Sequence, residues 1–117
     1  MNAAASIVVL VTAAANIGMA VADLFRARFV LATSADVDVP AGWVPLLGVA
    51  KGAGGVGLLL WFAGLTLLPA LAAAGLVCFF VGADVAHVRA RRFGTLAFPS
   101  AYLALAVASL CVVVAAP

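Results

Sequence analysis

Four long runs of apolar residues follow one another along the chain and leave little polar sequence between them. They cover residues 3–24, 43–67, 69–88 and 96–116. Each run has about 20 residues or more, which is enough for an α-helix to cross a hydrocarbon core of roughly 30 Å. A strand of a membrane barrel would alternate in polarity, and the runs do not. The pattern therefore predicts an all-α integral membrane protein, a single domain over residues 1–117 that forms a bundle of four transmembrane helices in a lipid bilayer.

The composition strengthens this prediction and excludes several classes of protein. Hydrophobic residues make up 68% of the 117 residues, charged residues make up 9%, and the mean hydropathy is +1.35. A soluble domain is usually about half apolar and about a quarter charged. A secreted disulfide scaffold and a nucleic-acid-binding protein are therefore excluded. The two cysteines, Cys78 and Cys111, lie inside apolar runs, where we expect packing residues rather than a disulfide pair.

The connections between the runs differ in charge. A long loop at 26–42 and a basic loop at 89–95 together hold five arginines, at positions 26, 28, 89, 91 and 92, whereas the turn near Leu68 and Pro69 carries no charge. The positive-inside bias then places both basic loops in the cytoplasm and both termini outside, in a multi-pass protein of the cell's inner (plasma) membrane. The first run has no basic residue before Arg26, so we expect a retained helix rather than a signal peptide.

The second run is rich in glycine. The glycines are Gly48, Gly52, Gly54, Gly55 and Gly57. Small residues at such spacing let helices approach one another closely in lipid. We expect this contact to lie within the chain, and a seam between two copies is the less favoured alternative.

Every predicted helix carries a polar side chain in the half of the membrane next to the two basic loops. These residues are Asn16, Asp23, Lys51, Asp84, His87 and Tyr102. Ionisable groups at the membrane centre cost roughly 2.5–3.5 kcal/mol each, so they usually face the bundle interior or a wet cavity. We therefore expect a polar pocket between the helices, open toward the basic loops. Lys51 is expected to pair with Asp84, with Asp23 as the second choice.

Three of these residues are the candidate catalytic groups, should the pocket carry chemistry. Asp84 and His87 could transfer protons, and Lys51 could stabilise an anion or a carbonyl. The candidate ligand-binding residues are Asn16, Asp23, Arg91 and Tyr102. Each also has a structural interpretation, as an ion pair, as a side chain that reaches the headgroups, or as a contact to lipid phosphates. One histidine and two membrane aspartates do not indicate a metal site, and the sequence leaves open the cofactor and whether the chain is an enzyme.

Short motifs spread over most of the chain carry a family resemblance. Val39-Pro40-x-x-Trp43-x-x-Leu46-x-Gly48-x-x-Lys51 is followed by Gly-rich apolar sequence, Gly75-Leu76-Val77, His87-Val88-Arg89 and Pro99 at the opening of the last helix. In these motifs and in its four-helix layout, the chain resembles the DoxX-like membrane proteins. The resemblance implies a link to oxidoreductase systems, including quinone-coupled sulfur oxidation and oxidative-stress complexes, and it marks Lys51 and His87–Arg89 as family-like polar positions. The sequence has no redox cysteine pair, which argues against a thiol–disulfide role.

Three functions agree with these features. The favoured one is binding of a small amphipathic or quinone-like molecule, with its head at Lys51, Asp84 and His87 and its tail among the apolar helices. The first alternative is a non-catalytic membrane subunit of a larger complex. The second is a homodimeric small-molecule transporter, which ranks last because neither Asp23 nor Asp84 lies near the midplane, where transporter sites usually lie.

Overall fold

The computed structural model describes residues 2–115 and consists of helices joined by short connections. Four long helices run through the molecule: α1 (Ala3–Leu24), α3 (Val44–Leu59), α4 (Leu67–Arg89) and α5 (Ala97–Ala115). A short helix, α2 (Arg28–Asp36), and three 3-10 segments, η1 (Ala41–Trp43), η2 (Leu60–Ala63) and η3 (Phe93–Thr95), complete the described chain. Four helical stretches are long and apolar enough to cross a membrane, with mean hydropathy between 1.6 and 2.1. The predicted four-helix membrane bundle is therefore confirmed, and the protein is a multi-pass membrane protein.

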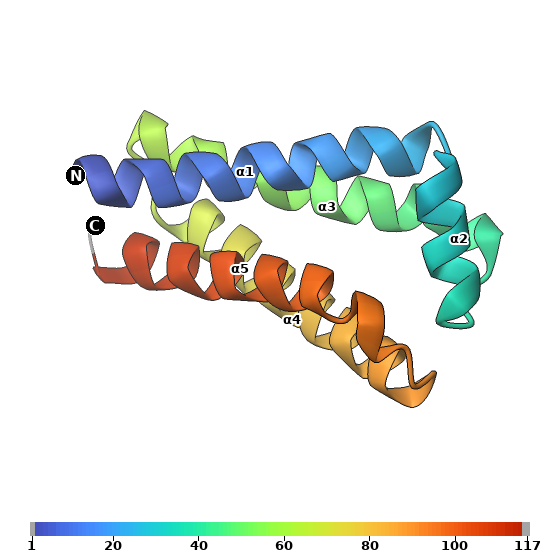
Figure 1. Ribbon diagram of the computed structural model, residues 1–117. Coiled ribbons are helices and arrows are strands. Elements are labelled where there is room, and N and C mark those ends of the chain that lie inside the picture. The colour runs from blue at the N-terminus through green and yellow to red at the C-terminus, as the bar shows by residue number, and fades with distance from the viewer. Residues whose placement is uncertain (1, 116–117) are drawn as a thin grey trace.

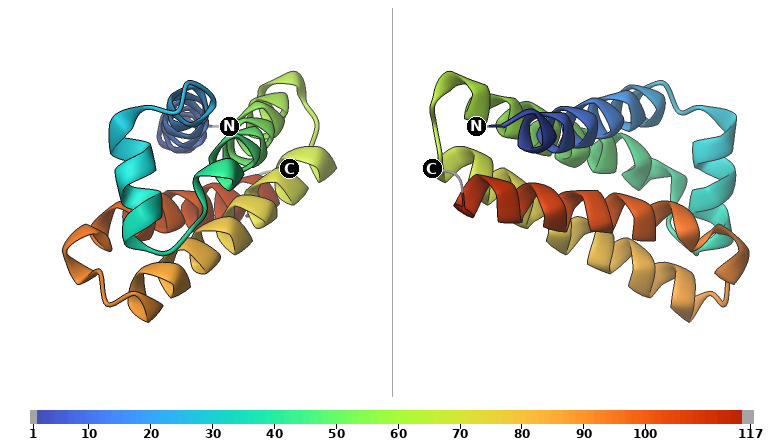
Figure 2. Two further views of the ribbon diagram at one scale, coloured as in Figure 1. Left: turned by 90° about the vertical axis from the view of Figure 1, so that its right-hand side faces the viewer. Right: turned by 60° about the vertical axis from the view of Figure 1, so that its left-hand side comes forward.

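The bundle is built from two helix pairs. α1 packs along α3, and α4 packs along α5, while α3–α4 and α1–α5 contacts join the pairs into a closed ring of neighbours. The two pairs diverge toward one end of the molecule, where α2 lies, and both chain termini lie at the other end (Figure 1). Figure 2 shows from two further sides that α2 crosses between the diverging pairs. This divergence opens space inside the bundle at the α2 end.

Glycines set the close approach of α1 to α3. A Cβ at Gly48 would lie 2.7 Å from Asp23 Cβ, and a Cβ at Gly55 would lie 3.0 Å from the Ala13 carbonyl oxygen. Another two glycines, Gly54 and Gly57, face α4 in the same way. The glycine-rich run therefore makes contacts within the chain, as the favoured interpretation of the sequence predicts.

The second span ends earlier than the sequence suggests. Apolar residues continue through 67, but the α-helix stops at Leu59 and continues as the 3-10 segment η2 to Ala63. Gly64 follows in the left-handed region, with φ of 89°, and ends the segment. The turn to α4 therefore lies at 64–66 and not at Leu68 and Pro69. Pro69 lies in the first turn of α4, where its missing N–H costs little. The last span was expected to reach residue 116, which lies outside the described residues.

The loop expected at 26–42 contains α2, a helix that the sequence analysis missed. Two residues in the left-handed region, Arg26 (φ 53°) and Asp38 (φ 61°), lie just outside its two ends. One side of the helix, including the buried Val30, faces the bundle interior, while Arg28 and Asp36 are exposed. α2 has only nine residues of mixed polarity, so the sequence does not show it as a long apolar run.

The apolar core fills the half of the bundle away from α2. Val9, Leu58, Leu76 and Val113 are each 2% exposed or less. A polar contact also joins α1 to α5 there, since Ser109 Oγ donates to Thr12 Oγ1 over 2.8 Å. Such contacts between small hydroxyl residues help to hold helices together in lipid. The half near α2 is packed less fully, and it contains the candidate site.

Candidate functional site

A cavity of about 860 Å³ lies between the diverging helix pairs and beneath α2. Its walls are mostly apolar, with aromatic side chains from Trp43, Phe79, Phe80 and Phe98. The inward side of α2 closes one wall through Phe29, Val30, Thr33 and Ser34, together with Val37 directly after the helix. These residues follow the spacing i, i+1, i+4, i+5 and i+8, which is the face of an amphipathic helix. That spacing is the signal in the sequence that could have identified α2 as part of the site.

Lys51 and Asp23 form an ion pair in the cavity wall. Lys51 Nζ lies 2.8 Å from Asp23 Oδ2, and the two side chains are 12% and 2% exposed. Asp23 Oδ2 accepts no hydrogen bond from residues 2–115, so the nearby Lys51 ammonium is its charge partner. Nζ also lies 5.4 Å from the centre of the Phe79 ring, within the range of a cation–π contact. The charged end of Lys51 thus lies against both a carboxylate and an aromatic face.

The expected Lys51–Asp84 pair is wrong, because the pairing of helices brings Lys51 to α1 and not to the far side of α4. Gly48 and Gly52 let α3 approach α1 closely, and this contact brings Lys51 next to Asp23. Asp84 instead accepts a hydrogen bond from Ser100 Oγ on α5, over 3.2 Å. It is half-buried and does not belong to the cavity wall.

His87 lies in the cavity wall with one ring nitrogen engaged and the other free. Nδ1 lies 2.9 Å from the Ala83 carbonyl oxygen one turn earlier on α4. A carbonyl oxygen can only accept, so Nδ1 donates its N–H to Ala83, and in the neutral form of the ring Nε2 keeps a lone pair that can accept. Nε2 is buried and has no hydrogen-bond partner among the described residues. The ring is only 5% exposed, so the free acceptor is held in an apolar setting.

Tyr102 also lines the cavity, from α5. Its hydroxyl is 3.5 Å from the Ala15 carbonyl oxygen, a long contact, and its ring lies 5.2 Å from that of Phe80. Four of the seven candidate residues, Asp23, Lys51, His87 and Tyr102, thus share one cavity. They come from four different long helices, so only the assembled bundle brings them together.

The remaining three candidates lie elsewhere. Asn16 is fully buried on α1, where Nδ2 donates to the Thr12 carbonyl oxygen over 2.9 Å and Oδ1 has no partner among the described residues. Arg91 is exposed in the connection after α4, with φ of 57°. Asp84 lies beside Ser100 as described above. None of the three lines the cavity.

The described residues offer no cluster for a metal ion or a disulfide. Within residues 2–115, no three His, Cys, Asp or Glu side chains come together in a metal-binding arrangement. Cys78 and Cys111 are both free thiols, and both are exposed. The side chains in the cavity that could take part in chemistry are the Lys51–Asp23 pair, the His87 imidazole and the Tyr102 phenol.

Comparison with known proteins gives a family for the chain. No curated protein and no solved structure matches it. The model of the DoxX-like family matches residues 7–109, which include all four long helices in whole or in large part. The family that the sequence motifs suggested is thereby shown: this four-helix membrane protein belongs to the DoxX-like family.

Proposed function

We propose that the protein binds a small amphipathic or quinone-like molecule in the cavity beneath α2. The observation that carries this proposal is the cavity itself, about 860 Å³ of mostly apolar space with a few polar groups converging on it. Small-molecule sites commonly have this size and this mixture of an apolar lining with a few placed polar groups. Four helices contribute the polar groups, so the whole bundle would hold the ligand.

Lys51 and His87 are the groups that would receive the polar head. An ammonium has three N–H donors, so Lys51 keeps donors for a ligand carbonyl or anionic oxygen beside its contact to Asp23. In the neutral form of the ring, His87 Nε2 is a buried acceptor to which no described residue donates, a state that costs about 1–3 kcal/mol. A hydroxyl group that reached it would relieve that cost. Oxidoreductase-linked or acid–base chemistry at this site would use His87 for proton transfer and Lys51 to stabilise the developing charge.

The packing of the bundle fits a site open to one side of the membrane better than it fits a transport path. The half of the bundle away from α2 is filled by buried apolar side chains, among them Val9, Leu58 and Val113. We further propose that the α2 end faces the cytoplasm at the inner (plasma) membrane, because the five arginines lie in the connections at this end.

Filling the cavity with a side chain tests the proposal. Ala86 lines the cavity and is partly buried, so Ala86→Leu extends an existing side chain into the cavity. Ala14→Leu is the matched control, because Ala14 is exposed on α1 and does not line the cavity. The probe is methyl-benzoquinone, and the readout is quenching of the cavity residue Trp43 in a Trp61→Phe background.

We expect saturable quenching in the parent protein, affinity weakened by about tenfold or more in Ala86→Leu, and unchanged affinity in Ala14→Leu. Absence of saturable quenching in the parent protein would overturn the proposal. Equal binding by all three proteins would also overturn it, since the probe would then bind outside the cavity.

A further inference from the structure

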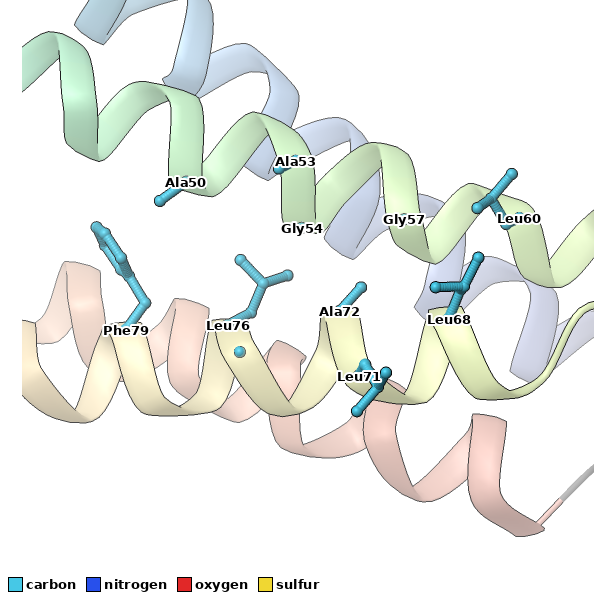
Figure 3. Close-up of a pocket in the computed structure, with 11 residues that line it drawn as sticks. Ala50, Ala53, Gly54, Gly57, Leu60, Leu68, Leu71, Ala72, Leu76 and Phe79 are labelled. Carbon is cyan, nitrogen blue, oxygen red and sulfur yellow. The ribbon is translucent and has the colours of Figure 1, made fainter.

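A second, smaller hollow runs along the outside of the bundle between α3 and α4. Its volume is about 420 Å³, and every residue that lines it is apolar or glycine. Figure 3 shows the small residues Ala50, Ala53, Gly54 and Gly57 on α3 facing longer side chains on α4. The lining extends from Ala50 on α3 to Leu60 at the start of η2, about 15 Å at 1.5 Å per residue. This groove, as we call it, has the length and the lining that suit a single hydrocarbon chain.

Phe79 separates the groove from the cavity beneath α2. It is the residue that lines both spaces. In Figure 3 its ring stands at one end of the groove, opposite Ala50. The same ring also lines the cavity, where Lys51 Nζ lies 5.4 Å from the ring centre. The groove therefore meets the cavity next to the group that would bind the ligand head.

We propose that the apolar tail of the cavity's ligand leaves the cavity at Phe79 and lies in the groove between α3 and α4. The inference rests on the proposed function and narrows it: the ligand class is an amphipathic molecule with a long hydrocarbon chain, and not a head group alone. A head at Lys51 and a tail along α4 would place both parts in surroundings of matching polarity. The groove would also give the molecule a route between the cavity and the lipid.

The location of the tail, and not its affinity, is the informative measurement. Lipid chains are as apolar as leucine, so moving a tail from lipid into an apolar groove adds little binding free energy. The probe is therefore a benzoquinone with a decyl chain that carries a diazirine at its end, photolysed with the protein in detergent. Peptide mass spectrometry then maps the labelled residues.

We expect the label on groove residues such as Leu60, Leu68 and Leu71, and we expect excess methyl-benzoquinone to remove it, because the head alone competes for the cavity. Gly75→Leu fills the groove, since Gly75 lines it and a Cβ there meets nothing within 4 Å. This variant should lose most of the groove label while its binding of methyl-benzoquinone stays unchanged. The control variant Gly18→Leu should keep both the groove label and the binding of methyl-benzoquinone.

Three outcomes would overturn the inference. Label spread over all lipid-facing surfaces would show that the tail has no fixed place. Groove label that survives excess methyl-benzoquinone would show a lipid site unconnected with the cavity. Failure of methyl-benzoquinone to quench Trp43 would overturn the proposed function as well, whereas saturable quenching together with either of the first two results would overturn this inference alone.

Discussion

At the scale of single residues, Asp23 and His87 are two buried polar side chains of the cavity wall, and they differ in the partners of their polar atoms. Asp23 is 1% exposed and depends on the Lys51 ammonium for its partner. His87 has Nδ1 bonded to its own helix, and Nε2 has no hydrogen-bond partner in the part of the chain that the structure describes. A buried ion pair adds little net stability, but removing one partner leaves an uncompensated charge. Substitution of Asp23 or Lys51 alone should therefore destabilise the fold, whereas substitution of His87 does not break an ion pair.

We expect Asp23→Ala and Lys51→Met each to lower the free energy of unfolding by about 3 kcal/mol, because each leaves a lone charge in an apolar wall. The double variant should recover most of this loss. Unfolding by SDS in mixed micelles measures all three. Asp84→Ala combined with Lys51→Met is the control, and these two should act additively because Asp84 bonds to Ser100 and not to Lys51. Additive behaviour of Asp23→Ala and Lys51→Met would show that the ion pair contributes nothing.

At the scale of helices, the close α1–α3 contact decides which polar groups meet. Lys51 follows Gly48 by three residues, so the approach that Gly48 permits also brings Lys51 to α1. The sequence predicted the depth of each polar residue in the membrane, because depth follows from position along a helix. It offered Asp84 and Asp23 as partners of Lys51 but could not rank them correctly, since the pair is Lys51–Asp23. That choice depends on which helices are neighbours, and the lipid provides no hydrophobic force that favours one pairing over another.

We expect Gly48→Ala to lower the free energy of unfolding by about 2 kcal/mol, because the new methyl group would lie 2.7 Å from Asp23 Cβ. Gly18→Ala is the matched control on α1. It meets no atom within 4 Å and should be neutral or stabilising by up to about 1 kcal/mol, since alanine favours helix more than glycine does. SDS titration measures both variants. Equal effects would contradict a close contact at Gly48.

At the scale of the whole molecule, polarity is unequal between the two ends. The five arginines lie in the connections at the α2 end, whereas the turn at the other end, residues 64–66, has no charged residue. The cavity and the exposed aromatic side chains of Phe25, Phe93 and Phe98 are also at the α2 end. Basic and aromatic residues together are typical of a membrane interface. The cavity, the basic residues and these aromatic side chains therefore share one end of the molecule, and the apolar core occupies the other.

Cysteine labelling tests the orientation that this asymmetry favours. In a background with Cys78→Ala and Cys111→Ala, a membrane-impermeant maleimide added to intact cells should modify Thr66→Cys, in the uncharged turn, and leave Gly94→Cys, in the basic connection, unmodified. After permeabilisation both should react. Labelling of Gly94→Cys in intact cells would contradict the cytoplasmic placement of the α2 end.

The sequence by itself determined that the chain forms four helices long and apolar enough to span a membrane, that most of its polar side chains gather toward one end of these helices, and which family motifs it carries. These properties follow from local hydrophobicity and from position along each helix. Only the tertiary structure decided that Lys51 meets Asp23, that Asp84 turns to Ser100, and that α2 covers a cavity between diverging pairs. Each of these depends on the direction in which a side chain faces across the bundle. That direction is set by steric fit between helices distant in sequence, such as Gly48 against Asp23, and it leaves no local periodic signal in the chain.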